Sequence, residues 1–387
     1  MGSNIESKTG YVTTSQIKEY QGEYGPIIDL GLGTSPIGPA KELEEPLRQR
    51  NPFYELAKYP TDPLHVHTRE LLLAGIGIEG LTYESVIFDG NGSYGAGDEV
   101  VRFLAKKGCR QILAPVYSFP NVAQWAHRHC VDYIPIHSSN NLDPLSSIYQ
   151  ILKLGKELEN TIVYLDYPNN PFGIVDPDLM RKLVVHVVQN GGVPLIDLAF
   201  GEVLGEEFKE AIQFVVNNGG IALGSLSKTQ GLPGLRTGYA ILSKKFTTDG
   251  YNGGERLVFG INGEAEFVYN QLFFPDNQGN CLAKIHAQRV AKYNRQTNLI
   301  LYQMLKNLGL QVLPTDLRTQ IQVIHAENLP DFYQRLRRVG IITESLADYQ
   351  ITLGGRMGYK NSAVRMLTPG TGQLDEVIKR IQIALAL

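Results

Sequence analysis

Seven short apolar runs constrain the fold of this chain more than any other feature of its sequence. They lie between about residues 84 and 242 and alternate with helical patterns such as "GDEVVRFLAKKG" and "PDLMRKLVVHVVQNGG". The runs are "SVIFD", "QILAP", "VDYIPI", "TIVYLDY", "VPLIDLAF", "IALGSLS" and "TGYAILS". Short runs that are apolar on both faces are typical of strands in a parallel sheet covered by helices. The pattern therefore predicts an α/β domain with a mainly parallel seven-stranded sheet.

The rest of the chain predicts a second, smaller domain. A length of 387 residues suits one large domain plus a smaller one. Residues 282–310 have the pattern of one long amphipathic helix, and strand-like runs and a final helix follow it. We expect residues 46–280 to form the large domain, and residues 1–45 and 281–387 to form a small α+β domain.

Composition argues against several classes of function. A net charge of −3 with 19% charged residues gives no basic surface for nucleic acid and no polybasic arm for a membrane. No apolar run approaches membrane-spanning length, and the N-terminal "MGSNIESKTGYVTTSQ" has no apolar signal-peptide core. The three cysteines show no C-x-x-C spacing, which zinc sites commonly use. We therefore expect a cytoplasmic protein with a small-molecule ligand and no metal site.

Polar side chains follow three of the predicted strands, at the sheet edge where ligands of α/β proteins bind. Asn170 follows "TIVYLD" within "YPNNPFG", and Asp197 follows "VPLI". The stretch "SLSKTQGLPGLRTG" follows "IALG" and contains Lys228 and Arg236. Taken singly, "YPNNPFG" could be a plain turn, and "SLSKTQGLPGLRTG" could be a solvated basic loop. A carboxylate at the end of an apolar strand, however, is costly to bury unless a cation meets it.

A glycine-rich turn at residues 90–97, between a strand and a helix, can hold an anion with its backbone N–H groups. Together these features indicate a site for a phosphorylated cofactor with a ring nitrogen and an aldehyde. An amine would form an imine with the aldehyde, a carboxylate would keep the ring nitrogen protonated, and an amide would donate to the ring hydroxyl. Arginine, serines and the turn would hold the phosphate. The residues in these roles are Lys228, Asp197, Asn170, Arg236, Ser225, Ser227 and the turn residues Gly92, Ser93 and Tyr94.

With "S-x-S-K" followed by "P-G-L-R-x-G", and with Asn170 and Asp197 in the right order, the chain resembles a family of enzymes. It resembles fold-type I pyridoxal 5'-phosphate (PLP) enzymes of aminotransferase class I/II, nearest to the histidinol-phosphate aminotransferase and threonine-phosphate decarboxylase branch. The resemblance runs from about Tyr59 to Arg365. It implies a three-layer αβα large domain, PLP as the cofactor and a homodimer with shared active sites.

The resemblance also assigns roles to residues outside the cofactor motifs. Tyr117 matches an aromatic ring stacked on PLP, and Tyr59 matches a tyrosine that reaches the phosphate of the neighbouring subunit's PLP. Arg365 matches the arginine that grips the substrate's α-carboxylate. Thr34 and Ser35 fall where the family's N-terminal loop covers the substrate. From spacing alone, Tyr117 could equally be a core residue and Arg365 part of a surface ion pair.

Three positions depart from the family pattern. Phe200 stands where these aminotransferases usually have a tyrosine that donates to the ring hydroxyl, and Phe172 replaces the usual threonine of "NNPTG". Thr343 and Glu344 stand where the histidinol-phosphate enzymes place a second arginine for the substrate phosphate. A phosphate facing a carboxylate would be repelled. We therefore expect a neutral or cationic amino acid, with Glu344 or Glu19 facing its side chain unless these are ordinary solvated charges.

The reaction predicted from the cofactor site begins with Lys228, which removes the Cα proton of an amino acid joined to PLP. The chain is similar to PLP cyclases that convert hydroxylated arginine to cyclic guanidino acids of the capreomycidine and enduracididine type. With the departures above, this favours elimination and cyclisation. The alternative is an aminotransferase that uses an amino acid and a 2-oxo acid. A non-catalytic regulatory protein on the same fold is a third hypothesis, but such proteins often carry a DNA-binding segment.

Overall fold

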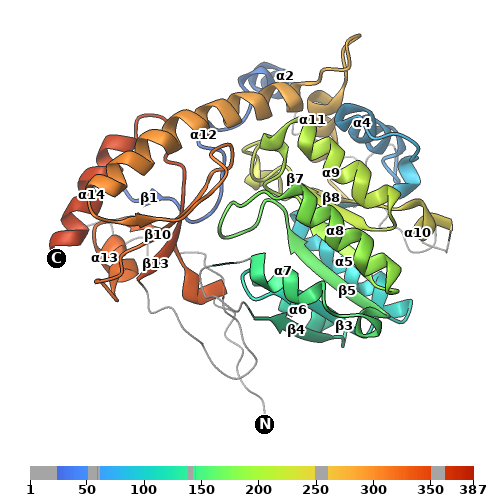
Figure 1. The fold of residues 1–387 in the computed structure, drawn as a ribbon. Coiled ribbons are helices and arrows are strands. Elements are labelled where there is room, and N and C mark those ends of the chain that lie inside the picture. The colour runs from blue at the N-terminus through green and yellow to red at the C-terminus, as the bar shows by residue number, and fades with distance from the viewer. Residues whose placement is uncertain are drawn as a thin grey trace.

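The computed structural model of the protein describes residues 24–50, 59, 62–137, 143, 145–248, 260–349 and 362–387. Figure 1 shows a larger α/β part that contains the main sheet and a smaller part built from the C-terminal region. Over the described ranges, no helix is both long enough and apolar enough to cross a membrane.

The main sheet has seven strands in the order β2-β8-β7-β6-β5-β3-β4, as the seven apolar runs predict. Its strands are β2 (Val86–Asp89), β3 (Gln111–Pro115), β4 (Asp132–Ile136), β5 (Thr161–Asp166), β6 (Val193–Asp197), β7 (Ile221–Ser225) and β8 (Gly238–Leu242). The strands from β7 to β4 run parallel, and β8 is antiparallel to both of its neighbours. The prediction of a mainly parallel sheet is therefore confirmed.

Helices cover both faces of this sheet and give three layers. Alternate residues of each strand point to opposite faces, so Val163 and Leu165 enter one core while Ile162 and Tyr164 enter the other. The first core includes α4 (Val66–Ile76), α8 (Pro177–Gln189), α9 (Glu206–Asn217) and α11 (Gly263–Phe273), with α7 (Leu145–Ile151) also on this side. The second includes α5 (Gly92–Lys106), α6 (Val122–Arg128) and α10 (Lys244–Thr248). Burial on both faces explains why the strand runs are continuously apolar.

The smaller part is connected to the larger part by α12 (Leu282–Asn307), which extends from one to the other (Figure 1). A four-stranded antiparallel sheet has the order β12-β13-β10-β9. Its elements are β9 (Gln311–Val312), β10 (Ile321–His325), β12 (Glu344–Ser345) and β13 (Ala363–Leu367), packed with α13 (Phe332–Arg338) and α14 (Leu374–Ala386).

Part of the N-terminal region lies against the C-terminal region. Strand β1 (Ile28–Asp29) pairs in parallel with β11 (Ile341–Ile342), and α2 (Glu44–Gln49) follows at the predicted domain boundary. The domain limits given above stay a prediction.

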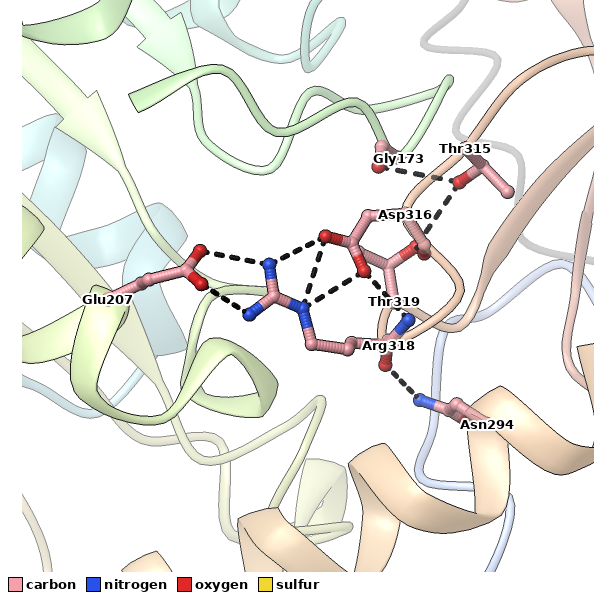
Figure 2. A network of polar contacts seen from close by, with 7 residues as sticks. All are labelled: Gly173, Glu207, Asn294, Thr315, Asp316, Arg318 and Thr319. Carbon is pink, nitrogen blue, oxygen red and sulfur yellow. Dashed lines mark hydrogen bonds and ion pairs between the residues drawn. The ribbon is translucent and has the colours of Figure 1, made fainter. Parts of the chain in front are cut away.

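An ion-pair network around Arg318 joins the two parts, as Figure 2 shows. The Arg318 guanidinium donates to both Glu207 carboxylate oxygens, at 2.7 and 2.9 Å, and to Asp316 Oδ2 at 2.7 Å. The Asp316 backbone N–H donates to the Gly173 carbonyl at 3.1 Å. Gly173 has φ +69°, and a Cβ there would lie 2.3 Å from Thr315 Oγ1, so glycine is required at this close approach. The network thereby fixes the loop after β5, which carries Asn170.

Candidate functional site

The candidate site is a pocket beyond the carboxyl ends of β5, β6 and β7. Asp166 ends β5, Asp197 ends β6 and Ser225 ends β7, and Asp166 lies directly beside Asp197 in the parallel register. Parallel strands end at the same edge of the sheet, which is why these side chains meet. The loop after β7 brings Lys228 and Arg236 to the pocket, and the smaller part contributes Arg365.

Lys228 is held against the N-terminal segment of the chain. Its Nζ donates to the Leu32 carbonyl at 3.0 Å and lies 5.1 Å from the centre of the Phe200 ring. Gly33 has φ +76°, a backbone conformation that favours glycine, and a Cβ on it would lie 2.9 Å from this Nζ and displace it. Burial, together with the charge of Arg365, lowers the pKa of Lys228 to about 8. About a tenth of the amine is therefore neutral and nucleophilic at pH 7, far more than for an ordinary lysine.

Asp197 is a buried carboxylate with a fixed orientation. Its Oδ1 accepts from the Ala199 backbone N–H at 2.9 Å, and its Oδ2 lies 3.0 Å from the Tyr164 hydroxyl. Burial raises the pKa of Asp197, whereas these contacts and the charge of Lys228 act in the opposite direction. Such a carboxylate can stabilise a cationic ring N–H placed in the pocket.

The opposite end of the pocket favours an anion. Helix α5 begins there at Gly92, and its first N–H groups and dipole carry partial positive charge. Arg236 is adjacent, because the Gly92 N–H donates to the Arg236 carbonyl at 3.2 Å and Arg236 Nη2 donates to the Asn91 carbonyl at 3.3 Å. Ser93, Tyr94, Ser225 and Ser227 also line the pocket. The arrangement suits a phosphate group.

A third cluster surrounds Arg365, which is only 3% exposed. Its Nη2 forms an ion pair with Glu344 at 2.9 Å and also donates to the Gly31 carbonyl, and its Nη1 donates to Asn170 Oδ1 at 2.9 Å. The Tyr349 hydroxyl donates to the Glu344 carboxylate and lies 3.3 Å from Asn170 Oδ1. A buried guanidinium of this kind can hold a carboxylate in a bidentate fashion.

The comparisons with known proteins agree with this geometry. Residues 26–348 match the family model of aminotransferase class I and II. The chain belongs to this aminotransferase family. It is 23% identical to a histidinol-phosphate aminotransferase of Desulfotalea psychrophila over 371 residues, covering 89% of this chain and 87% of that protein.

Solved structures share the aminotransferase fold. The histidinol-phosphate aminotransferase of Sinorhizobium meliloti in complex with PLP has a TM-score of 0.72 at 16% identity, covering 100% of this chain and 99% of that one. MppP, in a structure soaked with its product 2-ketoarginine, has a TM-score of 0.67 at 13% identity, covering 93% and 100%. The three-layer, fold-type I architecture is thereby confirmed.

PLP is the cofactor that membership of the aminotransferase family implies, and the residues of the pocket fit it. An amine of lowered pKa, a buried carboxylate and an anion-binding helix N-terminus with an arginine all face one cavity. These are the groups that a PLP aldehyde, ring N–H and phosphate require: a nucleophile, a hydrogen-bond acceptor and hydrogen-bond donors, respectively. The enzyme is therefore PLP-dependent.

Most of the predicted site residues line this one pocket. They are Gly92, Ser93, Tyr94, Asn170, Asp197, Ser225, Ser227, Lys228, Arg236, Glu344 and Arg365. Tyr117 does not line it, since its ring is 1% exposed and packs edge-on against Phe172 at 5.1 Å. Thr34 and Ser35 are also absent from the lining, where Leu32 stands instead. Tyr59 is 83% exposed. Glu19 lies outside the described residues.

Sequence reasoning missed Asp166, Tyr349 and Phe119, which line the pocket as well. Asp166 ends an apolar strand in the same way as Asp197, so the criterion that identified Asp197 would have identified it too. Phe119, two residues after Tyr117, lines the pocket, whereas Tyr117 does not. Tyr349 has no motif of its own and reaches the site only through the fold of the smaller part.

Proposed function

We propose that this PLP-dependent enzyme transaminates an α-amino acid with a neutral or cationic side chain, using a 2-oxo acid as the acceptor. The observation that carries the proposal is the single pocket shared by Lys228, Asp197 and the Arg365–Glu344 pair. The relatives named histidinol-phosphate aminotransferases support transamination over cyclisation.

When bound, PLP supplies an aldehyde that takes up amines and a protonated ring that withdraws electrons from Cα. The proposed task of Lys228 is to hold this aldehyde and then to move a proton from Cα, and its lowered pKa suits a base. Asp197 keeps the proton on the ring nitrogen. Asn170 Oδ1 accepts from Arg365, which orients its amide nitrogen to donate to the ring hydroxyl. The proposed phosphate ligands are Arg236, Ser225, Ser227 and the turn Gly92, Ser93 and Tyr94.

The substrate's α-carboxylate is assigned to Arg365. Glu344 occupies this guanidinium in the structure, 2.9 Å from Nη2, and it is the group that an incoming carboxylate would replace. Displaced Glu344 would then present a negative charge to the side chain of the substrate. A negative charge there repels a phosphate and attracts a guanidinium or ammonium group. The proposed substrate is for this reason not histidinol phosphate.

Elimination and cyclisation of a hydroxylated arginine is the second candidate, and Phe200 is the observation that favours it. The Phe200 ring lies beside Lys228 and lines the pocket, at the position where a tyrosine would donate to the ring hydroxyl. Without a tyrosine hydroxyl at this position, return of the proton, which transamination needs, can be slower relative to loss of the substrate's side-chain hydroxyl, which cyclisation needs. The same fold is known to hold an arginine-derived product in MppP.

One reaction series separates the two candidates. Purified enzyme is incubated in D₂O with arginine, γ-hydroxyarginine, histidine or histidinol phosphate, each with and without 2-oxoglutarate, and the products are weighed by mass spectrometry. We expect a keto acid from a cationic or neutral substrate only when the acceptor is present. A product lighter by one water and independent of acceptor would favour cyclisation instead. Turnover of histidinol phosphate alone would refute the role given to Glu344.

Glu344→Gln provides the matching variant. It should weaken kcat/KM about tenfold for a cationic substrate, the loss expected of one charge-assisted contact, and leave a neutral substrate within about twofold. Glu210→Gln removes a carboxylate from a surface ion pair with Arg181 and is the control. Equal losses with both substrates would mean that Glu344 only positions Arg365.

We further propose a homodimer with shared sites. Tyr59, the residue that matches a tyrosine reaching the neighbouring subunit's phosphate, has a large ring that is 83% exposed in the single chain. Exposed tyrosines of this kind are enriched at interfaces. Sedimentation should give a dimer, and Tyr59→Phe should weaken PLP retention about threefold to tenfold by loss of one hydrogen bond. An active monomer would remove the argument for shared sites.

A further inference from the structure

Two buried carboxyl groups share one tyrosine hydroxyl at the floor of the pocket. Asp166 and Asp197 are 5% and 7% exposed and lie side by side at the ends of β5 and β6. The Tyr164 hydroxyl oxygen lies 2.8 Å from Asp166 Oδ1 and 3.0 Å from Asp197 Oδ2. Tyr164 itself is buried against Trp125, with ring centres 6.0 Å apart, so the hydroxyl is fixed between the two acids.

The number of protons limits how these contacts form. A tyrosine hydroxyl has one hydrogen to donate and can accept a second hydrogen bond. If both acids were ionised, only one contact would be a full hydrogen bond, and two adjacent negative charges would repel in a dry site. If one acid keeps its proton, that acid donates to the Tyr164 hydroxyl and the hydroxyl donates to the other acid, so both contacts are hydrogen bonds.

The surroundings favour the proton on Asp166. Asp197 lies near the Lys228 cation, which favours its ionised form. The titratable groups that act on Asp166 are Asp197 and Tyr164. The charge of Asp166 in turn raises the pKa values of Tyr133 of β4 and of Tyr349. Burial first, and then the charge of Asp197, raises the pKa of Asp166 well above its usual range. The Phe119 backbone N–H, 2.9 Å from Asp166 Oδ2, occupies the other oxygen and leaves Oδ1 toward Tyr164.

We infer that Asp166 is a protonated positioning residue that donates to Tyr164, whose hydroxyl in turn donates to Asp197 and holds it as a carboxylate aimed into the pocket. The inference deepens the proposed function, since it rests on the role given to Asp197. Asp166 would then orient Asp197 indirectly, through the Tyr164 hydroxyl.

The proton can be observed without any reaction. The full-length protein, with and without PLP, should show the infrared carbonyl band of a buried protonated carboxyl group at neutral pH. Asp166→Asn should remove the Asp166 component of this band, which the parent-minus-variant difference spectrum isolates, and Tyr164→Phe should shift that component. Tyr333→Phe, on α13 and outside the pocket lining, is the control and should leave that component unchanged. Glu202, a second buried carboxyl whose pKa burial raises to about 7, can contribute a band that is common to all these proteins. A parent-minus-Asp166→Asn difference spectrum without a carboxyl band would overturn the inference.

PLP retention provides the second readout. Asparagine mimics the protonated acid, because its amide can also donate to Tyr164, so Asp166→Asn should hold PLP within about twofold of the parent. Asp166→Leu and Tyr164→Phe should each weaken PLP binding about tenfold through lost orientation of Asp197. If Asp166→Asn loses as much PLP affinity as Tyr164→Phe, the inference is wrong. If the band behaves as expected but no amino acid is turned over, the shared proton stands and the proposed function fails.

Discussion

Lys228→Ala is expected to abolish turnover and the absorbance of the lysine-bound cofactor together. In the proposed mechanism this one amine both binds the aldehyde and moves the Cα proton, so its loss removes both steps. Borohydride reduction of the parent enzyme followed by peptide mass mapping should place PLP on Lys228. The surface variant Lys209→Ala, which removes a lysine paired with Glu206, should behave like the parent. Cofactor trapped on a different lysine would refute the assignment.

The pH dependence of cofactor attachment tests the same residue. Burial lowers the pKa of Lys228 to about 8, so the neutral, reactive amine increases as the pH rises through that value. The rate at which PLP joins the cofactor-free protein should therefore reach half its maximum near pH 8 and level off about one pH unit higher. An ordinary lysine would keep gaining rate to about pH 10. A rate that still climbs well above pH 9 would show that the pKa of this amine is not lowered as expected.

Asp197→Ala is the second change with a very large expected effect. Without the carboxylate the ring nitrogen loses its proton and withdraws electrons poorly, so kcat should fall by about 10³-fold or more. Asp178→Ala removes an exposed carboxylate from the first turn of α8 and should leave kcat unchanged. Single-turnover loss of the substrate's Cα hydrogen is the measurement. Near-normal rates in Asp197→Ala would place the essential carboxylate elsewhere, with Asp166 as the first alternative.

The large sheet could be predicted from sequence because strands buried on both faces are apolar without interruption. The same continuity makes polar residues at or just after the end of a strand conspicuous, which is how Asp197 and Lys228 emerge. Asp166 illustrates the limit of that approach, since it was counted as part of its strand although it ends it. Its pairing with Tyr164 depends on the alignment of neighbouring strands, and spacing along one strand does not reveal it.

Contacts between distant segments were the least predictable part of the site. The position of Tyr117 resembles that of a stacking ring, yet its side chain packs with Phe172 and does not line the pocket, whereas Phe119 does. The Glu344–Arg365 pair forms because β12 and β13 are neighbours, with these two residues directly opposite in the antiparallel register. Neither outcome follows from local pattern, because each depends on how the smaller part folds over the sheet.

The reversed strand β8 has a consequence for how the two proposed cofactor anchors are spaced. Ser225 and Gly238 lie opposite each other where the chain leaves β7 and enters β8, so the segment between them departs and returns at one edge of the sheet. Asn170 and Asp197 arrive there on separate βα units, but Lys228 and Arg236 belong to one uninterrupted loop. If Lys228 binds the aldehyde and Arg236 the phosphate, as proposed, this loop sets the distance between the two groups that hold the ends of the cofactor. One residue gained or lost within this loop would change the separation of Lys228 and Arg236 directly, whereas surface turns elsewhere on the sheet can accommodate insertions.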